Sequence, residues 1–226
     1  MAVITGGGRG IGASIARSLA GDGWSVVVSA RSRDQIAGVA AETGGRAVTM
    51  DVASRDSVAE AFAEIGHVDL LVANAGIGGD RDFWRTFEVN VLGVHLCCEA
   101  AVAAGASRIV ITGSGSAYLP GASNTAYSAS KAAICRYAET LNNELEIPVF
   151  VFSPGLVQTE MTSSFADDLP WTPPELAPEL VRKIGTGRYD ELAGRYIHAE
   201  HDDIDELLAR ADEIRDQDLN AIRLRR

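Results

Sequence analysis

The chain has 226 residues, a length that suits one α/β domain and is too short for two substantial domains. Hydrophobic residues make up 46% of the sequence, which indicates a folded core and argues against disorder. The formal net charge is −11, and because such an acidic surface repels phosphate backbones, nucleic acid is not expected as a partner.

The three cysteines, Cys97, Cys98 and Cys135, are odd in number and lack CxxC spacing. Adjacent cysteines make a poor disulfide pair, so we expect packing thiols in a reducing compartment. The first residues form a short apolar run that leads directly into a glycine-rich loop, which indicates a strand rather than a signal peptide. No uninterrupted apolar stretch is long enough to span a bilayer. These features predict a cytoplasmic protein without a membrane partner.

Short β-branched runs alternate with alanine-rich segments of helical spacing. The expected strands are Ala2–Thr5, Ser25–Ala30, Ala47–Met50, Val68–Ala73, Arg108–Thr112 and Pro148–Phe152. The expected helices are Ile11–Ala20, Asp34–Thr43, Ser54–Ile65 with Ser54 as its cap, Asp82–Ala104 and Thr125–Glu146. Apolar strands separated by helices predict one domain over residues 1–226, a Rossmann-type α/β fold with a doubly wound, mainly parallel sheet and helices on both faces.

Residues 158–178, called the lid segment below, hold four of the seven prolines and show no clear periodicity. A long aperiodic segment in a compact enzyme is often a lid. Because this segment follows a strand on the expected ligand edge of the sheet, we predict a substrate lid; a packed surface loop is the alternative. The expected pocket wall consists of apolar and aromatic residues, namely Tyr118, Leu119, Met161, Phe165 and Trp171.

The C-terminal part predicts a helix from near Pro173 to Gly185, with Thr172 as its N-cap, and a last strand at Gly194–His198. Residues 202–226 predict a charged helical tail with one apolar face. That face must be covered by the domain itself or by a second subunit.

The glycine-rich loop Thr5-Gly6-Gly7-Gly8-Arg9-Gly10-Ile11-Gly12 lies between the first strand and the first helix. Glycine allows close approach of the backbone to a ligand, and a helix N-terminus offers free amides to a phosphate. The context predicts a dinucleotide site; a glycine-rich turn without a ligand is the alternative.

The second strand ends at Ala30-Arg31, without the carboxylate that usually binds the ribose 2′-hydroxyl in NAD enzymes. The rigid donor fork of arginine suits a 2′-phosphate, and Arg9 in the glycine-rich loop is within reach of the same group. The two arginines predict NADP(H) as the cofactor; two solvated surface charges are the alternative.

Tyr127-Ser128-Ala129-Ser130-Lys131 has the pattern YxxxK. On a helix, residues i and i+4 share one face, so the phenol and the ammonium group point the same way. A free tyrosine has a pKa of ~10, and a nearby cation favours the phenolate that an acid/base catalyst needs at neutral pH. The pattern predicts a catalytic pair; an ordinary pair on a helix surface is the alternative.

The spacing TGxxxGIG resembles the classical type of the short-chain dehydrogenase/reductase family. Further motifs of that family follow in the same order over residues 3–159: Asp51-Val52, Asn74-Ala75-Gly76, Asn90 within EVNVLG, Ser114 thirteen positions before Tyr127, YxxxK and Pro154-Gly155-Leu156-Val157-Gln158-Thr159.

The resemblance implies a complete catalytic tetrad. Tyr127 is then the acid/base, Lys131 stabilises its phenolate and holds the ribose, and Ser114 binds the substrate oxygen. Asn90 anchors a water molecule that links to Lys131 and completes a proton relay.

The resemblance also implies the cofactor contacts. The phosphate loop is formed by Gly6, Gly10, Ile11 and Gly12, the adenine contacts are Asp51 and Val52, and Pro154 and Gly155 lie beside the nicotinamide. In the family, the backbone of Val157 holds the carboxamide with help from Thr159, Gly76 lets the cofactor pass, and Asn74 stabilises the sheet. A basic residue at Arg9 or Arg31 implies NADP(H), and a dimer or tetramer is expected.

Two features depart from the family. The segment 77–89 is short, which leaves the size of the substrate pocket open, and the chain ends in a charged helix instead of the usual Asp-Gly-Gly close. The run His198-Ala199-Glu200-His201-Asp202-Asp203 has possible metal ligands, but its spacing resembles no zinc site, so we expect no metal and a helix N-cap at Asp202 or Asp203.

These observations predict an NADP(H)-dependent carbonyl reductase or alcohol dehydrogenase. Its expected substrate is a small, hydrophobic ketone, aldehyde or secondary alcohol. One alternative is an NAD-dependent sugar or polyol dehydrogenase, against which Ala30 argues. The other is a catalytically silent NADP(H)-binding sensor or scaffold, against which the complete tetrad argues.

Overall fold

The computed structural model describes residues 1–78, 82–121 and 123–224. Its strands are β1 (Ala2–Thr5), β2 (Val26–Ala30), β3 (Arg46–Thr49), β4 (Leu70–Ala73), β5 (Arg108–Thr112), β6 (Val149–Ser153) and β7 (Tyr196–His198). They form one sheet in the order β3-β2-β1-β4-β5-β6-β7, and every neighbouring pair is parallel. The Rossmann-type α/β fold expected from the sequence is confirmed.

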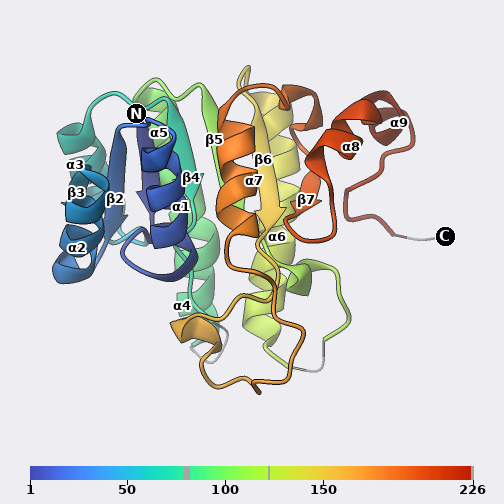
Figure 1. The fold of residues 1–226 in the computed structure, drawn as a ribbon, viewed down its shortest axis with the longest axis horizontal. Coiled ribbons are helices and arrows are strands. Elements are labelled where there is room, and N and C mark those ends of the chain that lie inside the picture. Colours follow the sequence, from blue (N-terminus) through green and yellow to red (C-terminus); the bar gives the residue numbers. More distant parts are fainter. Residues whose placement is uncertain (79–81, 122, 225–226) are drawn as a thin grey trace.

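The helices are α1 (Gly10–Gly21), α2 (Arg33–Thr43), α3 (Arg55–Ile65), α4 (Phe83–Phe87), α5 (Gly93–Ala103), α6 (Thr125–Glu144), α7 (Leu176–Gly185), α8 (Ile204–Ala209) and α9 (Ala211–Asp216). Figure 1 shows α1 and α7 in front of the sheet, with α5 and α6 behind it. Ser54 caps α3 by accepting a hydrogen bond from the Ser57 amide, as expected.

The two faces of the sheet each have their own hydrophobic core. Within β1, Ala2 and Ile4 belong to the core beneath α1, α2 and α7, whereas Val3 belongs to the core beneath α3, α5 and α6. Since successive strand residues point to opposite faces, covering both faces requires strands that are apolar throughout. This explains why the strands lack polar alternation.

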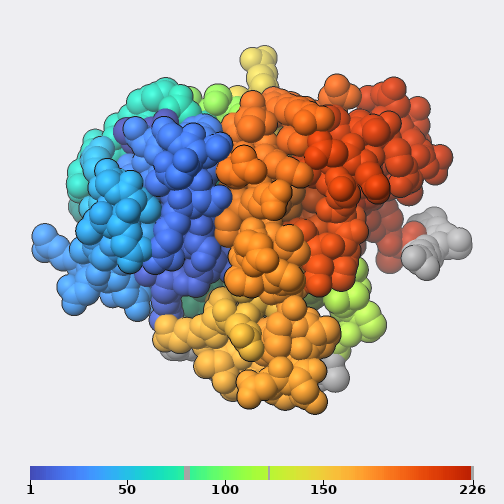
Figure 2. Space-filling view, viewed as in Figure 1, coloured from blue at the N-terminus to red at the C-terminus, as the bar shows by residue number. Residues whose placement is uncertain are grey.

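The carboxyl ends of the parallel strands lie at one edge of the sheet, the lower edge in Figure 1. The chain order reverses between β1 and β4, which places a crevice between the loops that follow these strands. The lid segment lies at this same edge and forms a lobe below the body of the molecule in Figure 2. The loops after β1, β4, β5 and β6, which carry most of the predicted site residues, therefore meet at this edge of the sheet.

The predicted helix Asp82–Ala104 is not continuous. One turn of π-helix, Glu88–Leu92, separates α4 from α5.

The stretch Phe83–Ala103 has the length and composition of a membrane span, with a mean hydropathy of 1.3, but half of it is buried inside the protein, as in the core helix of a globular domain.

The three cysteines are free and buried. Burial raises the pKa of Cys98 to about 12 and that of Cys135 to about 11. Thiols held in their neutral form are poor nucleophiles, which agrees with a packing role.

In the C-terminal part, the predicted start of α7 is wrong, and the structure shows what covers the apolar face of the tail. Helix α7 begins at Leu176 rather than near Pro173, and Thr172 is not its N-cap: the Thr172 hydroxyl accepts a hydrogen bond from the Leu156 amide at 3.0 Å. The predicted tail helix is divided into α8 and α9, and its apolar face packs on the domain itself through residues that include Ile204, Leu207 and Ile214. The last two residues of the tail, 225 and 226, lie outside the described part of the chain.

Gly12 allows a close approach between α1 and the β1 and β4 loops. A Cβ atom at Gly12 would overlap Gly6 O and lie 2.5 Å from the Asn74 side-chain nitrogen. We expect Gly12→Ala to lower the free energy of unfolding by about 1–3 kcal/mol, because this overlap forces backbone shifts. Urea denaturation followed by circular dichroism measures the change.

Gly38→Ala in α2 is the matched control, because a Cβ atom there meets nothing within 4 Å. Replacing a glycine inside a helix should stabilise the protein by about 0.5–1 kcal/mol. A Gly12→Ala protein as stable as the wild type would contradict the steric argument.

Candidate active site

The glycine-rich loop joins β1 to α1 with two residues in the left-handed region, Gly6 at φ 65° and Gly10 at φ 52°. The first hydrogen bond of α1 runs from the Ala13 amide to Arg9 O at 3.2 Å. The amides of residues 10–12 precede that bond and remain available at the positive end of the helix dipole. Gly6, Gly10, Ile11 and Gly12 belong to this loop, which is the predicted phosphate cradle.

Asn74 holds this loop to the sheet. Its side-chain nitrogen donates to Thr5 O at 3.0 Å, and its backbone amide donates to Thr5 Oγ1 at 3.1 Å. Thr112 Oγ1 at the end of β5 donates to Asn74 Oδ1 at 3.4 Å. A single side chain therefore links the ends of β1, β4 and β5, which is the sheet-stabilising role that the family resemblance implied.

The two arginines expected to bind a 2′-phosphate have different surroundings. Arg31 follows β2, is exposed and makes no ion pair with any described residue. Arg9 is also exposed, but its guanidinium forms an ion pair with Glu160 of the lid segment. Of these two arginines, Arg9 is engaged in an ion pair and Arg31 is not paired with any described residue.

The pair expected to contact adenine lies beyond the end of β3. Val52 is buried against Gly93, where a Cβ atom would come within 2.7 Å of Val52 Cγ2. Asp51 Oδ1 accepts from the Ala53 amide at 3.0 Å, and Asp51 Oδ2 pairs with Arg85 at 3.3 Å. This carboxylate therefore also anchors α4.

Asn90 lies on the π-helical turn and is completely buried. Asn90 Oδ1 accepts from the Ile77 amide at 2.9 Å, and Asn90 Nδ2 donates to Ile77 O at 3.0 Å. A Cβ atom at Gly76 would lie 3.3 Å from Asn90 Oδ1 and 3.9 Å from Lys131 Nζ. Glycine at this position therefore keeps the space between the amide and the ammonium group open. Residues 79–81 of the short segment 77–89 lie outside the described part of the chain.

Ser130 forms hydrogen bonds with two members of the predicted tetrad. This role was not predicted from the sequence. The Ser130 hydroxyl accepts from Asn90 Nδ2 at 3.1 Å and donates to Tyr127 O at 2.7 Å. It thereby ties the π-helical turn to the first turn of α6. A serine three residues after Tyr127 is visible in the sequence and is compatible with a hydrogen bond to Tyr127 O. Its other partner, Asn90, is 40 positions away in the chain, so the sequence pattern does not reveal that contact.

Lys131 and Tyr127 lie together on α6. Lys131 is buried, its Nζ lies 5.7 Å from the centre of the Tyr127 ring, and it donates to Thr112 O at 2.7 Å. An ammonium group has three donors, so two remain for other partners. Ser114 follows β5, two residues after Thr112, and caps the 3₁₀ turn Gly115–Ala117, which packs against α6. The structure thus gathers the four predicted catalytic residues around the first turns of α6.

The predicted nicotinamide-contacting residues follow β6. Gly155 has a φ of 80°, and a Cβ atom there would overlap the Thr172 side chain. Val157 is buried, its carbonyl accepts from Thr162 Oγ1 at 2.9 Å, and Thr159 lies over the glycine-rich loop. Pro154 opens this turn after the end of β6. The strand end and the start of the lid segment therefore face the phosphate cradle.

Residues 198–203, which the sequence offered as possible metal ligands, make local hydrogen bonds with one another and cap α8. The His198 amide donates to Asp202, His198 Nδ1 accepts from the Glu200 amide at 3.2 Å, and Asp203 caps α8. Burial, with a further contribution from His201, lowers the pKa of His198. No group of three or more metal-ligating side chains occurs among the described residues.

The arrangement of loop, tetrad and sheet has a counterpart among known proteins. A family model described as short chain dehydrogenase matches residues 1–170. The chain belongs to the short-chain dehydrogenase family. The resemblance inferred from its motifs is confirmed, and membership establishes an oxidoreductase family that uses a nicotinamide cofactor.

Relatives of this short-chain dehydrogenase illustrate the range of the family. Over 193 residues it is 36% identical to cis-4-hydroxycyclohexanecarboxylate dehydrogenase of Sinomonas cyclohexanicum, an alignment that covers 75% of this chain and 78% of the relative. BdcA in complex with NADPH has a TM-score of 0.78 and 30% identity, over 87% of this chain and 91% of that chain. The 3-oxoacyl-acyl-carrier-protein reductase of Brucella melitensis in complex with NAD has a TM-score of 0.78 and 26% identity, over 88% and 94%. Similar structures thus bind either cofactor.

Asn90 is the side chain that joins the β4 loop to α6. We expect Asn90→Ala to lower the free energy of unfolding by about 1–3 kcal/mol, because the Ile77 amide and carbonyl lose their partner in a buried site. Asn143→Ala is the control: Asn143 is exposed on α6, so its removal should change stability by less than about 0.5 kcal/mol. Equal effects of the two substitutions in chemical denaturation would contradict the proposed anchoring.

Proposed function

We propose that the protein is an NADP(H)-dependent oxidoreductase, a carbonyl reductase or alcohol dehydrogenase. The observation that carries the proposal is the buried Lys131, whose Nζ donates to Thr112 O and lies 5.7 Å from the centre of the Tyr127 ring, with two donors left for other partners. A buried ammonium group is costly unless its charge is used or compensated. Beside a phenol, this charge stabilises the phenolate and prepares Tyr127 for proton transfer.

The cradle at the ends of β1 and β4 fits a dinucleotide. The free amides of residues 10–12 and the close approach at Gly6 and Gly12 would hold the pyrophosphate. Arg31, exposed and unpaired among the described residues, would bind a 2′-phosphate, and Ala30 offers no carboxylate to a ribose 2′-hydroxyl. These features favour NADP(H) over NAD(H) and argue against an NAD-dependent sugar or polyol dehydrogenase.

Each tetrad residue has one task in the proposed reaction. Nicotinamide supplies or accepts the hydride. In the direction of reduction, Ser114 orients the carbonyl oxygen and Tyr127 donates a proton to it. Lys131 stabilises the resulting phenolate and holds the ribose, while Asn90 and Ser130 keep α6 in register with the β4 loop.

The substrate is proposed to be a small, hydrophobic ketone, aldehyde or secondary alcohol. Large apolar side chains are exposed on the loop after β5 and on the lid segment, among them Tyr118, Leu119, Met161 and Phe165. Covering such side chains with an apolar substrate is favourable, by about 25 cal/mol per Å² of buried apolar surface. The lid segment is proposed to close over the substrate.

Oxidation of NADPH and of NADH over a panel of ketones, aldehydes and diketones tests the function. We expect turnover with NADPH on hydrophobic carbonyls, and a loss of at least about 100-fold in Tyr127→Phe because general acid catalysis disappears. NADPH binding by Tyr127→Phe, measured by fluorescence titration, should persist and serves as the folding control.

Three results of this panel would contradict parts of the proposal. Equal or better turnover with NADH would refute the NADP(H) assignment. Undiminished turnover in Tyr127→Phe would refute the role of the phenol. NADPH binding without oxidation of either cofactor on any compound would favour a silent sensor.

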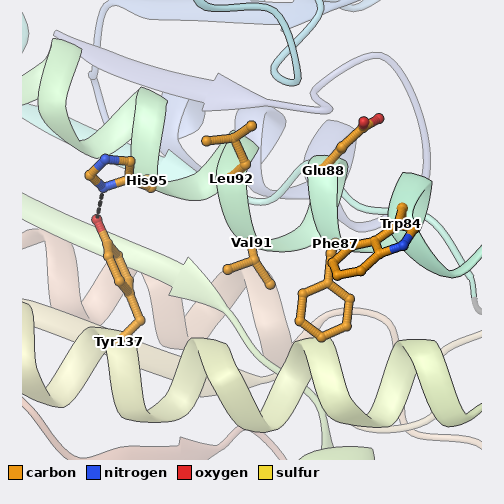
Figure 3. A pocket seen from close by; sticks show the side chains of 7 residues that line it. All are labelled: Trp84, Phe87, Glu88, Val91, Leu92, His95 and Tyr137. Atoms are coloured by element: carbon orange, nitrogen blue, oxygen red, sulfur yellow. Dashed lines mark hydrogen bonds between the residues drawn. The ribbon is translucent and has the colours of Figure 1, made fainter.

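We further propose a homo-oligomer in which a second copy covers an apolar surface on α4, the π-helical turn and α5. A hollow of about 500 Å³ opens there, and Figure 3 shows its lining of Trp84, Phe87, Glu88, Val91, Leu92, His95 and Tyr137. Trp84 is 70% exposed and Leu92 41% exposed. Exposed apolar side chains gathered around a hollow are typical of an interaction surface.

Light scattering after size exclusion tests the oligomer. The wild type should have the mass of a dimer or tetramer, and Leu92→Glu should shift it toward the monomer, because a buried unpaired charge is costly in an interface. Val102→Glu is the control, since Val102 is exposed on α5 but does not line the hollow. A wild type that is monomeric at all concentrations would contradict the proposal.

A further inference from the structure

The ion pair between Arg9 and Glu160 connects two segments that both border the cofactor cradle. Arg9 is the residue before α1, in an extended conformation with φ −160° and ψ 172°. Glu160 is the first residue of the 3₁₀ turn Glu160–Thr162, at the start of the lid segment. The pair therefore closes a link from the glycine-rich loop to the lid segment, across 151 positions of the chain.

Glu160 is presented by an ordered turn rather than by a free loop. Thr162 Oγ1 donates to Val157 O at 2.9 Å and accepts from the Thr159 amide at 2.9 Å. A Cβ atom at Gly10 would lie 3.5 Å from Thr159 Cγ2, so this turn rests directly on the glycine-rich loop. The position of Glu160 beside Arg9 is thus set by the contacts of its neighbours Thr159 and Thr162.

A carboxylate here affects the two nicotinamide dinucleotides unequally. A 2′-phosphate bound by Arg9 needs the charge of that guanidinium, and Glu160 competes with the phosphate for it. A dinucleotide with a free 2′-hydroxyl needs nothing from Arg9. Glu160 therefore penalises the phosphorylated cofactor more than the unphosphorylated one.

We infer that Glu160 is a residue that determines cofactor specificity: by holding Arg9, it reduces the preference for NADP(H) over NAD(H). The inference rests on the proposed function, because it assigns the 2′-phosphate to Arg9 as well as to Arg31. Both side chains of the pair are more than half exposed, so the effect is that of a surface ion pair, roughly two- to fivefold in relative affinity.

Dissociation constants for NADPH and NADH, measured by fluorescence titration at low salt, test the inference without requiring a substrate. The proteins are the wild type, Glu160→Gln, Arg9→Gln and the double variant. We expect Glu160→Gln to raise the preference for NADPH by roughly two- to fivefold when Arg9 is present, and to leave it unchanged in the Arg9→Gln background. The gain should shrink at high salt, since exposed charges are screened.

Asp168→Asn is the matched control. It removes the same charge from the same lid segment, but Asp168 is exposed and forms no ion pair with a described residue. Its preference for NADPH should equal that of the wild type. An equal gain in Asp168→Asn and Glu160→Gln would overturn the inference, because a general charge effect of the lid segment would then account for it.

The remaining outcomes separate the inference from the proposed function. If Arg9→Gln weakens NADPH binding but Glu160→Gln leaves the preference unchanged, the inference is overturned and the NADP(H) assignment stands. If the double variant binds NADPH as tightly as Glu160→Gln, Arg9 does not serve the phosphate even when it is released from Glu160, and the inference is overturned. A wild type that prefers NADH refutes the NADP(H) assignment, whereas a gain from Glu160→Gln that requires Arg9 would still support the role of Glu160.

Discussion

The side chain of Asn74 holds together the strand ends on which the site is built. Its hydrogen bonds reach Thr5 at the end of β1 and Thr112 at the end of β5, so three neighbouring parallel strands end in a fixed relation. Gly12 has no side chain, and this absence lets α1 pass within contact of the same amide. The glycine-rich loop and the carbonyl that binds Lys131 therefore both depend on the hydrogen bonds of one half-buried side chain, and breaking them would leave their partners unsatisfied.

A second group of hydrogen bonds fixes α6 relative to these strand ends. Thr112 O accepts from Lys131, while Asn90 binds both Ile77 after β4 and Ser130 on α6. The π-helical turn that carries Asn90 interrupts what would otherwise be one long helix, and such turns are frequently found at functional sites. Tyr127 is thus positioned by its own helix, and that helix is held by groups at the end of β5 and on the π-helical turn, which is itself bound to the loop after β4.

Much of the fold was accessible from local pattern. The strands and most helices were predicted to within a few residues, because the spacing of apolar residues follows from which side chains are buried in each element. The errors occurred where a distant partner decided the outcome. Thr172 has the chemistry of an N-cap, but it binds the Leu156 amide instead, and α7 begins later. The break at Glu88–Leu92 likewise leaves no local signature, since its residues suit an ordinary helix.

The sequence by itself determined the α/β class, the glycine-rich loop, the Tyr127–Lys131 pair and the lack of a carboxylate after β2, because each depends on residue type and short spacing. Ser114 and Asn90 were added to that pair by the family resemblance. Only the tertiary structure decided that Ser130 bridges Asn90 to Tyr127, that the tail covers the domain's own core, and that Arg9 faces Glu160 rather than standing free. These outcomes join residues far apart in the chain. Their partners are selected by the packing of helices and loops, which no local pattern encodes.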